Sequence, residues 1–324
     1  RGVYDAELAE SLAEIPASPA RNKGVAWGRF VGDRILKLRR DDGSDSVVDY
    51  EPSGEFGRWE PTPPRFADAL FPQWPFVTPF AMVSGDQFRV GPPPELTSIE
   101  YAIAFQEVKE LGAIDSPMRT ADETQIAFFW EDGPGSATPP GHWQIIAGQF
   151  AETFGTTLAE NARLFALLSI TQADAAIVSW DSKYHYDHFR PYTGITRADE
   201  DGNDATEPDS LWFPLIPTPP FPSYTSGHST FSGGSAEILA RFFGDDEIPF
   251  SSPAPDPHVW PDQLFDGSGD PVVRSWPSLS AAAEEAGQSR IYGGIHWQYD
   301  NQEALDSGRE LASYVFELFL TPLE

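Results

Sequence analysis

Residues 183–191 read KYHYDHFRP, and two later segments of related chemistry follow, PSYTSGH at residues 222–228 and SRIYGGIHWQYD at residues 289–300. Each segment places cationic or hydrogen-bonding side chains at fixed spacings, and together they describe a pocket for a tetrahedral oxyanion. The surrounding chain is strongly acidic, with 50 Asp and Glu residues against 21 Lys and Arg residues and a net charge of −29. A cluster of positive charge in such a chain calls for a reason, and an anionic ligand supplies one.

The composition limits the class of protein. A chain of 324 residues that is 40% hydrophobic and 13% aromatic can bury a substantial core, as one large domain or two. The acidic charge argues against nucleic acid or an anionic membrane as a partner, and no run of 18 apolar residues predicts a membrane span. The absence of cysteine excludes disulfides, thiolate metal sites and cysteine nucleophiles.

The location of the protein is inferred indirectly. Only 4 of the 21 basic residues are lysine, and an excess of carboxylates with so few lysines resembles the surfaces of salt-adapted proteins. The chain starts at Arg1 with no visible leader, which fits a targeting segment that was removed or left out. We therefore expect a secreted or periplasmic bacterial protein adapted to salt; the alternative is simply a soluble acidic protein.

Helical periodicity dominates the chain, and no alternating strand or repeat is evident. The expected fold is an all-α bundle with long irregular loops, which would place its sites between facing helices. Residues 41–97 form a proline- and aromatic-rich arm that we expect to pack on the core. We expect a first region at residues 1–97, helices plus this arm, and a helical-bundle domain at residues 98–324. The predicted helices span residues 5–15, 23–38, 98–111, 120–130, 142–154, 156–189, 229–243, 278–291 and 298–319.

The first segment brings two cations together. Lys183 and Arg190 are seven residues apart near the end of a predicted helix, so we expect both on one face, within reach of one ligand. Two surface charges are the alternative interpretation. The aromatic residues between them favour burial instead.

The second segment predicts an anion site at a helix start. Either Ser226 or Ser229 can cap the helix that follows, and its free backbone amides and dipole favour an anion. Gly227 lets a ligand approach the backbone closely. A Ser-Gly turn beside an incidental His228 is the alternative if the triplet stands alone.

The third segment needs a break to converge. On a continuous helix Arg290 and His296 would lie about 120° apart around the axis, and Gly293 and Gly294 supply the break that can bring them together. The alternative is a hinge whose histidine packs beside Trp297. The combined occurrence of the three segments favours a site.

The three segments resemble a known signature. The pattern Lys183-x6-Arg190-Pro191, Ser226-Gly227-His228 and Ser289-Arg290-x5-His296 is similar to the one shared by vanadium-dependent haloperoxidases and type 2 phosphatidic-acid-phosphatase-like acid phosphatases. The resemblance covers roughly residues 98–324 and implies that this region is the vanadate-binding catalytic domain, of the helical-bundle type. It also implies vanadate as the cofactor, with phosphate as an ion that can occupy the same site.

Residues next to the signature resemble the haloperoxidase branch. The segment FPSYTSGH at residues 221–228 is similar to that branch, whereas the phosphatases usually have Pro where Thr225 stands here. Trp180 and Phe221 match residues near the halide in chloroperoxidase-type members. The stretch around Asp132 is similar to the family segment whose aspartate supports the catalytic histidine, with Glu131 as the competing assignment.

The resemblance implies a role for each residue. His296 would bind vanadium, and the vanadate oxygens would be held by Lys183, Arg190, Ser226, Gly227 and Arg290. His228 would be the acid–base group, oriented by Asp132, and Lys183 would polarise bound hydrogen peroxide, while Trp180 and Phe221 would line the halide pocket. The implied partners are hydrogen peroxide, halide and a small organic acceptor, and a homo-oligomer is an open alternative.

Two other functions fit parts of the pattern. In an acid phosphatase, His296 would be the nucleophile and His228 would protonate the leaving group. A non-enzymatic oxyanion binder would need cations and amides but not an acid–base histidine supported by a carboxylate. The presence of both His228 and His296 therefore argues against this function. The remaining histidines match no ligand position of the family, and we expect packing or supporting roles for them: His142, His185, His188 and His258.

Overall fold

The computed structural model describes residues 2–321 and divides into two compact units, residues 1–46 and residues 47–324. The first unit contains α1 (Gly2–Ala13) and α2 (Pro19–Leu38), and neither helix buries a residue. The side chain of Ser18 caps α2 by accepting a hydrogen bond from the Arg21 amide at 3.1 Å, with Pro19 as the first helical residue. Both helices overlap the ranges expected from the sequence.

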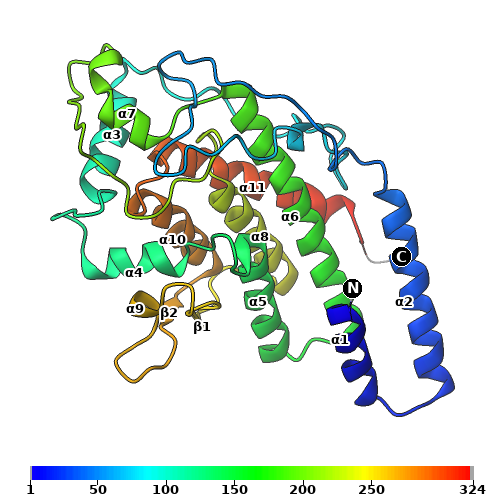
Figure 1. Ribbon diagram of the computed structural model, residues 1–324. Helices are drawn as coiled ribbons and strands as arrows, with labels where there is room; N and C mark the ends of the chain where they lie inside the picture. Colours follow the sequence, from blue (N-terminus) through cyan, green and yellow to red (C-terminus); the bar gives the residue numbers. More distant parts are fainter. Residues whose placement is uncertain (1, 322–324) are drawn as a thin grey trace. The chain divides into compact units, whose positions relative to one another are not determined.

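The second unit is a helical bundle, which confirms the expected all-α class (Figure 1). Its α-helices are α3 (Ile99–Leu111), α4 (Ala121–Phe129), α5 (Thr138–Thr153), α6 (Leu158–Tyr186), α7 (Pro191–Thr196), α8 (Gly227–Phe243), α9 (Pro261–Leu264), α10 (Leu279–Tyr292) and α11 (Gln298–Leu318). Two short 3₁₀-helices, η1 (Trp74–Phe76) and η2 (Ala198–Glu200), lie in the loops. The boundary that we expected between residues 97 and 98 stays a prediction.

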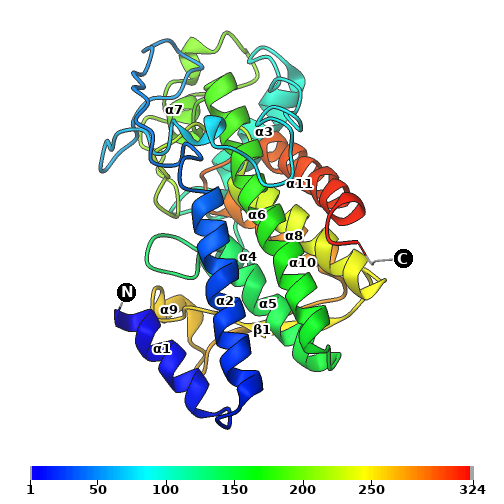
Figure 2. The same ribbon diagram turned by 90° about the vertical axis from the view of Figure 1, so that its right-hand side faces the viewer.

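Helix α8 is the centre of the bundle. It packs most extensively on α11 and then on α6 and α10, and both views show it among these helices (Figure 2). The close contact depends on glycine: a Cβ atom at Gly233 would lie 2.4 Å from the Leu305 carbonyl oxygen of α11, and one at Gly308 would lie 2.3 Å from the Thr230 carbonyl oxygen of α8. Small residues therefore set the spacing of these two helices.

Helix α6 is a core helix. Among residues 2–321 it alone has the length and apolar composition to cross a membrane, with a mean hydropathy of 1.3 over its most apolar window. That window is 56% buried inside the fold, and buried helices of soluble proteins pass the same test. The burial explains its composition, because α6 contacts α8, α11 and α5 along its length.

The part of the arm that belongs to the second unit, residues 47–97, is attached to α6 by buried polar contacts. The carboxylate of Asp174, which is fully buried, accepts hydrogen bonds from three successive backbone amides at residues 80–82, at 2.7–3.1 Å. Further along α6, Asp181 forms a bidentate ion pair with Arg89 at 2.6 and 2.9 Å. These contacts hold the arm beside the end of α6 that carries Lys183.

Two sequence-based expectations were wrong in detail. No strand was expected, but β1 (Phe250–Pro253) and β2 (Val273–Trp276) form a two-stranded antiparallel sheet. In this sheet Phe250 lies opposite Trp276. Strands of four residues are too short to show alternation in the sequence. The segment after residue 190, expected to be a loop, begins with the short helix α7.

Candidate active site

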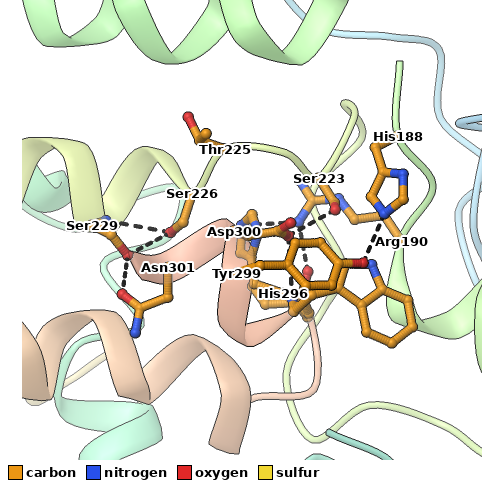
Figure 3. A network of polar contacts seen from close by, with 12 residues as sticks. His188, Arg190, Ser223, Thr225, Ser226, Ser229, His296, Tyr299, Asp300 and Asn301 are labelled. Carbon is orange, nitrogen blue, oxygen red and sulfur yellow. Dashed lines mark hydrogen bonds and ion pairs between the residues drawn. The ribbon is translucent and has the colours of Figure 1, made fainter. Parts of the chain in front are cut away.

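The three sequence segments meet at one place in the second unit. They supply the carboxyl-terminal end of α6, the residue that precedes α7, the amino-terminal end of α8 and the turn between α10 and α11. Figure 3 shows Arg190, Ser223 and His296 around Asp300, with Ser226 and Ser229 beside Asn301. Residues more than a hundred positions apart are thus brought into one buried polar network.

Lys183 lies on α6 and is fully buried. Its Nζ donates to three backbone carbonyls of the second segment, those of Pro222, Ser223 and Thr225, at 3.0, 2.9 and 2.5 Å. These three bonds use all three donors of the ammonium group. Lys183 therefore fixes the path of this segment and reaches an oxyanion only by giving up a carbonyl partner.

Arg190 is also fully buried. The expectation that it shares a helical face with Lys183 was wrong. Helix α6 ends at Tyr186, the next residue, Asp187, has a left-handed backbone (φ 53°), and Arg190 is extended (φ −84°, ψ 157°) before Pro191. Proline disfavours a helical conformation in the residue before it. The turn nevertheless brings Arg190 to the same segment, where its Nε donates to the Phe221 carbonyl at 2.8 Å.

The guanidinium groups of Arg190 and Arg290 have donors left over. Arg190 Nη1 donates to the Ile295 carbonyl at 2.7 Å, and Arg290 Nη1 donates to the carbonyls of Trp130 and Glu131 at 2.7 and 3.2 Å. Within residues 2–321, no hydrogen-bond partner exists for Arg190 Nη2, Arg290 Nε or Arg290 Nη2, and all three atoms are buried. Buried N–H groups without partners are costly, so these atoms point to an acceptor that the chain itself does not provide.

His296 is held in one orientation by Asp300. Its Nδ1 lies 2.8 Å from Asp300 Oδ2, and its Nε2 lies 3.1 Å from Arg190 Nη1. Arginine can only donate, so Nε2 accepts and carries the lone pair, and Nδ1 carries the proton and donates to the carboxylate. A histidine whose second nitrogen is bound to a carboxylate is the arrangement found at metal ligands.

Asp300 has further partners that fix it in turn. The Ser223 hydroxyl donates to Asp300 Oδ2 at 2.7 Å, and the Trp297 amide donates to the same oxygen at 3.2 Å. Sequence reasoning did not assign a role to either Asp300 or Ser223. The spacing of four residues from His296 to Asp300 was a signal for the aspartate, whereas nothing local marked Ser223.

The amino-terminal end of α8 carries the second segment's predicted anion site. Ser226 is the N-cap and accepts from the Ser229 amide at 3.3 Å, so of the two capping candidates it is Ser226 that caps. The Ser229 hydroxyl donates to Asn301 Oδ1 at 2.8 Å, and its oxygen lies 2.9 Å from Ser226 Oγ. Gly227 is the first helical residue, where the helix dipole is positive.

His228 is partly buried and follows Gly227 on α8. Its Nε2 lies 3.1 Å from the Glu131 carbonyl oxygen, which can only accept, so Nε2 carries a proton. In the neutral ring Nδ1 is then the nitrogen free to accept a proton. Burial, followed by the charge of Arg290, holds the pKa of His228 well below its ordinary value, so the ring is neutral near pH 7.

Asp132 does not orient His228 as we expected. Both of its carboxylate oxygens face Nδ1 of His142, at 3.1 and 3.3 Å, and the two side chains are buried. Glu131, the competing assignment, does not orient His228 by its side chain either, because its carboxylate accepts hydrogen bonds from the Gly133 amide and from Trp260 Nε1. The group that contacts His228 is a backbone carbonyl, which no side-chain pattern can show.

The expected halide residues lie together. The rings of Trp180 and Phe221 are 4.9 Å apart, and Lys183 Nζ lies 5.0 Å from the centre of the Phe221 ring and 5.7 Å from that of Trp180. The guanidinium carbon of Arg190 lies 5.0 Å from the Phe221 ring. An apolar wall thus adjoins two of the cations.

Three buried cations act on His296. Burial lowers the pKa values of Lys183, Arg190 and Arg290, and for Lys183 the charge of Arg190 adds to this effect. Burial raises the pKa of Asp300 to about 7, against the opposing effects of Ser223 and Lys183. Glu131 and Asp132 oppose the effect of burial on the pKa of Arg290, but at His296 burial and the charges of all three cations together lower the pKa, so an anion at this position would be stabilised.

The fold and the site define a helical-bundle protein with a buried cluster of cations and histidines, and comparisons with known proteins identify the family. The family model described as the VCPO second helical-bundle domain matches residues 163–324, half of the chain. The crystal structure titled as the first bacterial vanadium-dependent iodoperoxidase is 32% identical, with a TM-score of 0.76, covering 92% of this chain and 69% of that one. The chain belongs to the vanadium-dependent haloperoxidase family.

Other relatives are more distant. Vanadium chloroperoxidase of Curvularia inaequalis is 26% identical over 372 residues, which cover 92% of this chain and 60% of that protein. A bacterial vanadium-dependent chloroperoxidase solved in its holo form has a TM-score of 0.75 at 16% identity, covering 96% of this chain and 77% of that one. The chain thus spans less than two thirds of the length of the curated relative.

Proposed function

We propose that the protein is an enzyme that uses hydrogen peroxide to oxidise halide to hypohalous acid, with vanadate held by His296 as its cofactor. The observation that supports this proposal most strongly is the combination at the pocket of unpartnered donors and an oriented histidine. Three buried guanidinium nitrogens of Arg190 and Arg290 have no acceptor among the described residues, and His296 presents a lone pair at Nε2. A multiply charged oxyanion with a metal centre satisfies both needs at once.

The donor set fits vanadate. His296 would provide the nitrogen ligand through Nε2, and Arg190 and Arg290 would bind the oxygens through their free N–H groups. Ser226 and the amide of Gly227 at the start of α8 would add oxygen contacts, and Lys183 would add one by giving up a carbonyl partner. When bound, vanadate supplies a Lewis acid that activates hydrogen peroxide toward halide.

The chain's own residues contribute orientation, charge and proton transfer. Asp300 keeps the proton of His296 on Nδ1, so the lone pair stays on Nε2, and that nitrogen would exchange its hydrogen bond from Arg190 Nη1 for the metal. The neutral His228, protonated on Nε2 by its bond to the Glu131 carbonyl, would take a proton at Nδ1. Lys183 would stabilise negative charge beside the Trp180–Phe221 wall, where we place the halide.

Reconstitution tests the proposal. The protein, freed of phosphate, is incubated with orthovanadate, and peroxide-dependent halogenation of a phenolic dye is followed with iodide, bromide and chloride. We expect vanadate-dependent halogenation with at least one halide. His296→Ala should abolish vanadate binding, while His185→Ala, at an exposed histidine, should not change it. Halogenation absent after full vanadate loading would disprove the proposed activity.

A phosphatase reaction is the second candidate, and one observation favours it. The lone pair at His296 Nε2, oriented by Asp300, is also what a nucleophile for a phosphate ester requires. Hydrolysis of p-nitrophenyl phosphate by the vanadate-free protein, measured beside halogenation, separates the two. A phosphatase would be inhibited by vanadate, whereas the haloperoxidase is activated by it.

A further inference from the structure

A short turn after α4 carries two groups of the proposed active site. The Trp130 carbonyl accepts a hydrogen bond from Arg290 Nη1, and the Glu131 carbonyl lies within hydrogen-bond distance of both Arg290 Nη1 and His228 Nε2. These two consecutive carbonyls therefore set the direction of the Arg290 guanidinium and the tautomer of His228. Whatever fixes this turn fixes both side chains.

The amides of Trp130 and Glu131 bond back to carbonyls of α4, at 3.2 Å each, but the turn belongs to no regular element beyond Phe129. Helix α4 ends at Phe129, and Asp132 has a left-handed backbone, with φ 46°, which a residue with a Cβ rarely adopts. Such a conformation persists only where the surroundings impose it. Contacts from other elements therefore hold the turn in this conformation.

His142 of α5 supplies two of these contacts and is fully buried. Its Nδ1 donates to the carboxylate of Asp132 at 3.1 Å, and its ring stacks on the indole of Trp130 with centroids 4.4 Å apart and planes 25° apart. The indole Nε1 in turn donates to Glu285 on α10 at 3.0 Å. One histidine thus holds the first and last residues of the turn.

The other ring nitrogen of His142, Nε2, is buried and makes no hydrogen bond to the described residues. Because the carboxylate of Asp132 only accepts, Nδ1 carries the proton in the neutral ring and Nε2 keeps a lone pair. The N–H group of the ring is therefore the one that faces Asp132.

We propose that His142 is a positioning residue for the reaction: through Asp132 and Trp130 it fixes the turn whose carbonyls keep His228 protonated on Nε2 and direct Arg290 into the oxyanion pocket. This proposal rests on the proposed function for the acid–base role of His228. The Asp132 carboxylate takes part by bonding to His142. It therefore affects His228 only indirectly, through the backbone of the turn and the Glu131 carbonyl. His142 itself touches neither substrate nor cofactor.

Two substitutions of His142 by side chains of nearly equal shape test the role of its Nδ1–H group as donor to Asp132. His142→Asn keeps an N–H group near the position of Nδ1, His142→Leu does not, and both remove the ring stacking on Trp130. His185→Leu, at an exposed histidine, is the control. We expect kcat of halogenation to fall about 10-fold or more in His142→Leu and to be restored to within about 3-fold of the wild type in His142→Asn. Equal kcat values in the two variants would overturn the proposal.

A spectroscopic readout is independent of halogenation. In protein labelled with ¹⁵N at histidine, the imidazole nitrogen shifts report which ring nitrogen of His228 carries the proton. We expect the Nε2–H tautomer in the unloaded wild type and in His142→Asn, and a mixture of tautomers in His142→Leu. An unchanged tautomer in a folded His142→Leu protein would refute the positioning role, even if its activity were lower.

Two further measurements keep the outcomes distinct. If His142→Leu does not fold, the double variant His142→Leu and Asp132→Asn, which leaves no unpaired carboxylate at residue 132, replaces it with the same expectations. If the wild type binds vanadate but does not halogenate, the proposed function fails, while the tautomer measurement still decides whether His142 controls His228. Orthovanadate affinity, measured by calorimetry, should fall several-fold in His142→Leu because Arg290 is no longer directed.

Discussion

At the scale of single residues, Asp300 should control how tightly the pocket holds an oxyanion. Its carboxylate accepts the Nδ1 proton of His296 and the hydroxyl proton of Ser223. In Asp300→Asn the negative charge is lost and the lone pair on His296 Nε2 becomes less basic. We expect the affinity for orthovanadate to fall by about 10- to 100-fold, as for other carboxylates behind a metal-bound histidine, measured by isothermal titration calorimetry.

The control for this substitution lies on the same helix. Asp306 is also on α11, and its side chain is 71% exposed and paired only with Arg309. Asp306→Asn removes the same charge from the protein without touching the pocket, and its vanadate affinity should equal that of the wild type. If both variants lose affinity equally, the effect comes from overall charge and Asp300 has no specific role.

The residues of the pocket were largely predictable, but their contacts were not. Lys183, Arg190 and Arg290 all lie near His296, but Lys183 and Arg190 come together through the turn at Asp187 and not through the shared helical face that their spacing predicted. Asp132 was assigned to His228 because the family pattern contains an aspartate there, and the structure pairs it with His142 instead. That pairing depends on how α5 packs against the end of α4, which no local pattern encodes.

At the scale of secondary-structure elements, the contact between α8 and α11 should not tolerate a methyl group. A Cβ at Gly233 would lie 2.4 Å from the Leu305 carbonyl oxygen and 3.0 Å from the Leu305 Cα, and backbone atoms cannot move aside as a side chain can. We expect Gly233→Ala to lower the free energy of unfolding by about 1–3 kcal/mol, measured by urea denaturation.

Gly148 provides the matched control. It lies in α5, and a Cβ there would meet nothing within 4 Å. Gly148→Ala should therefore raise the free energy of unfolding, by up to about 1 kcal/mol, because alanine favours the helix. Stabilisation by both substitutions would show that α8 and α11 are not in close contact.

Element boundaries were less predictable than the elements themselves. The expected helix at residues 156–189 ends three residues early because Asp187 adopts a left-handed conformation. Two contacts from the arm fix that residue: the Tyr50 hydroxyl donates to its carboxylate at 2.5 Å, and the Trp59 amide donates to its carbonyl at 2.8 Å. Both partners lie more than a hundred residues away, so the local sequence could not mark the end of the helix.

At the scale of the whole molecule, the net charge of −29 should make stability depend on salt. Repulsion among carboxylates opposes the compact state, and the screening length falls from about 10 Å at 0.1 M salt to about 3 Å at 1 M. We expect the melting temperature to rise steadily with sodium chloride. Sucrose at the same osmolality serves as an uncharged control, and an equal rise in both would show that charge screening is not the cause. Salt adaptation itself stays a prediction.

Acid should destabilise the protein through its buried histidines, and His188 allows a specific test. Burial, with a smaller effect of Arg58, lowers the pKa of His188 from 6.5 to about 3. Between these values the unfolded chain binds a proton that the folded protein does not, so stability falls as the pH decreases from about 6.5 to 3, by at most about 1.4 kcal/mol per pH unit for this group.

The substitution His188→Gln should reduce that dependence. The Gln side chain does not titrate, and its amide oxygen can still accept from the Tyr299 hydroxyl, which lies 2.8 Å from His188 Nε2. We expect unfolding free energies from urea titrations between about pH 4 and 7 to decline less steeply in this variant. The slope should decrease without disappearing, because burial also lowers the pKa values of His228 and His296. His185→Gln, at an exposed histidine, should keep the wild-type slope; if His188→Gln keeps it too, His188 is protonated in the folded protein.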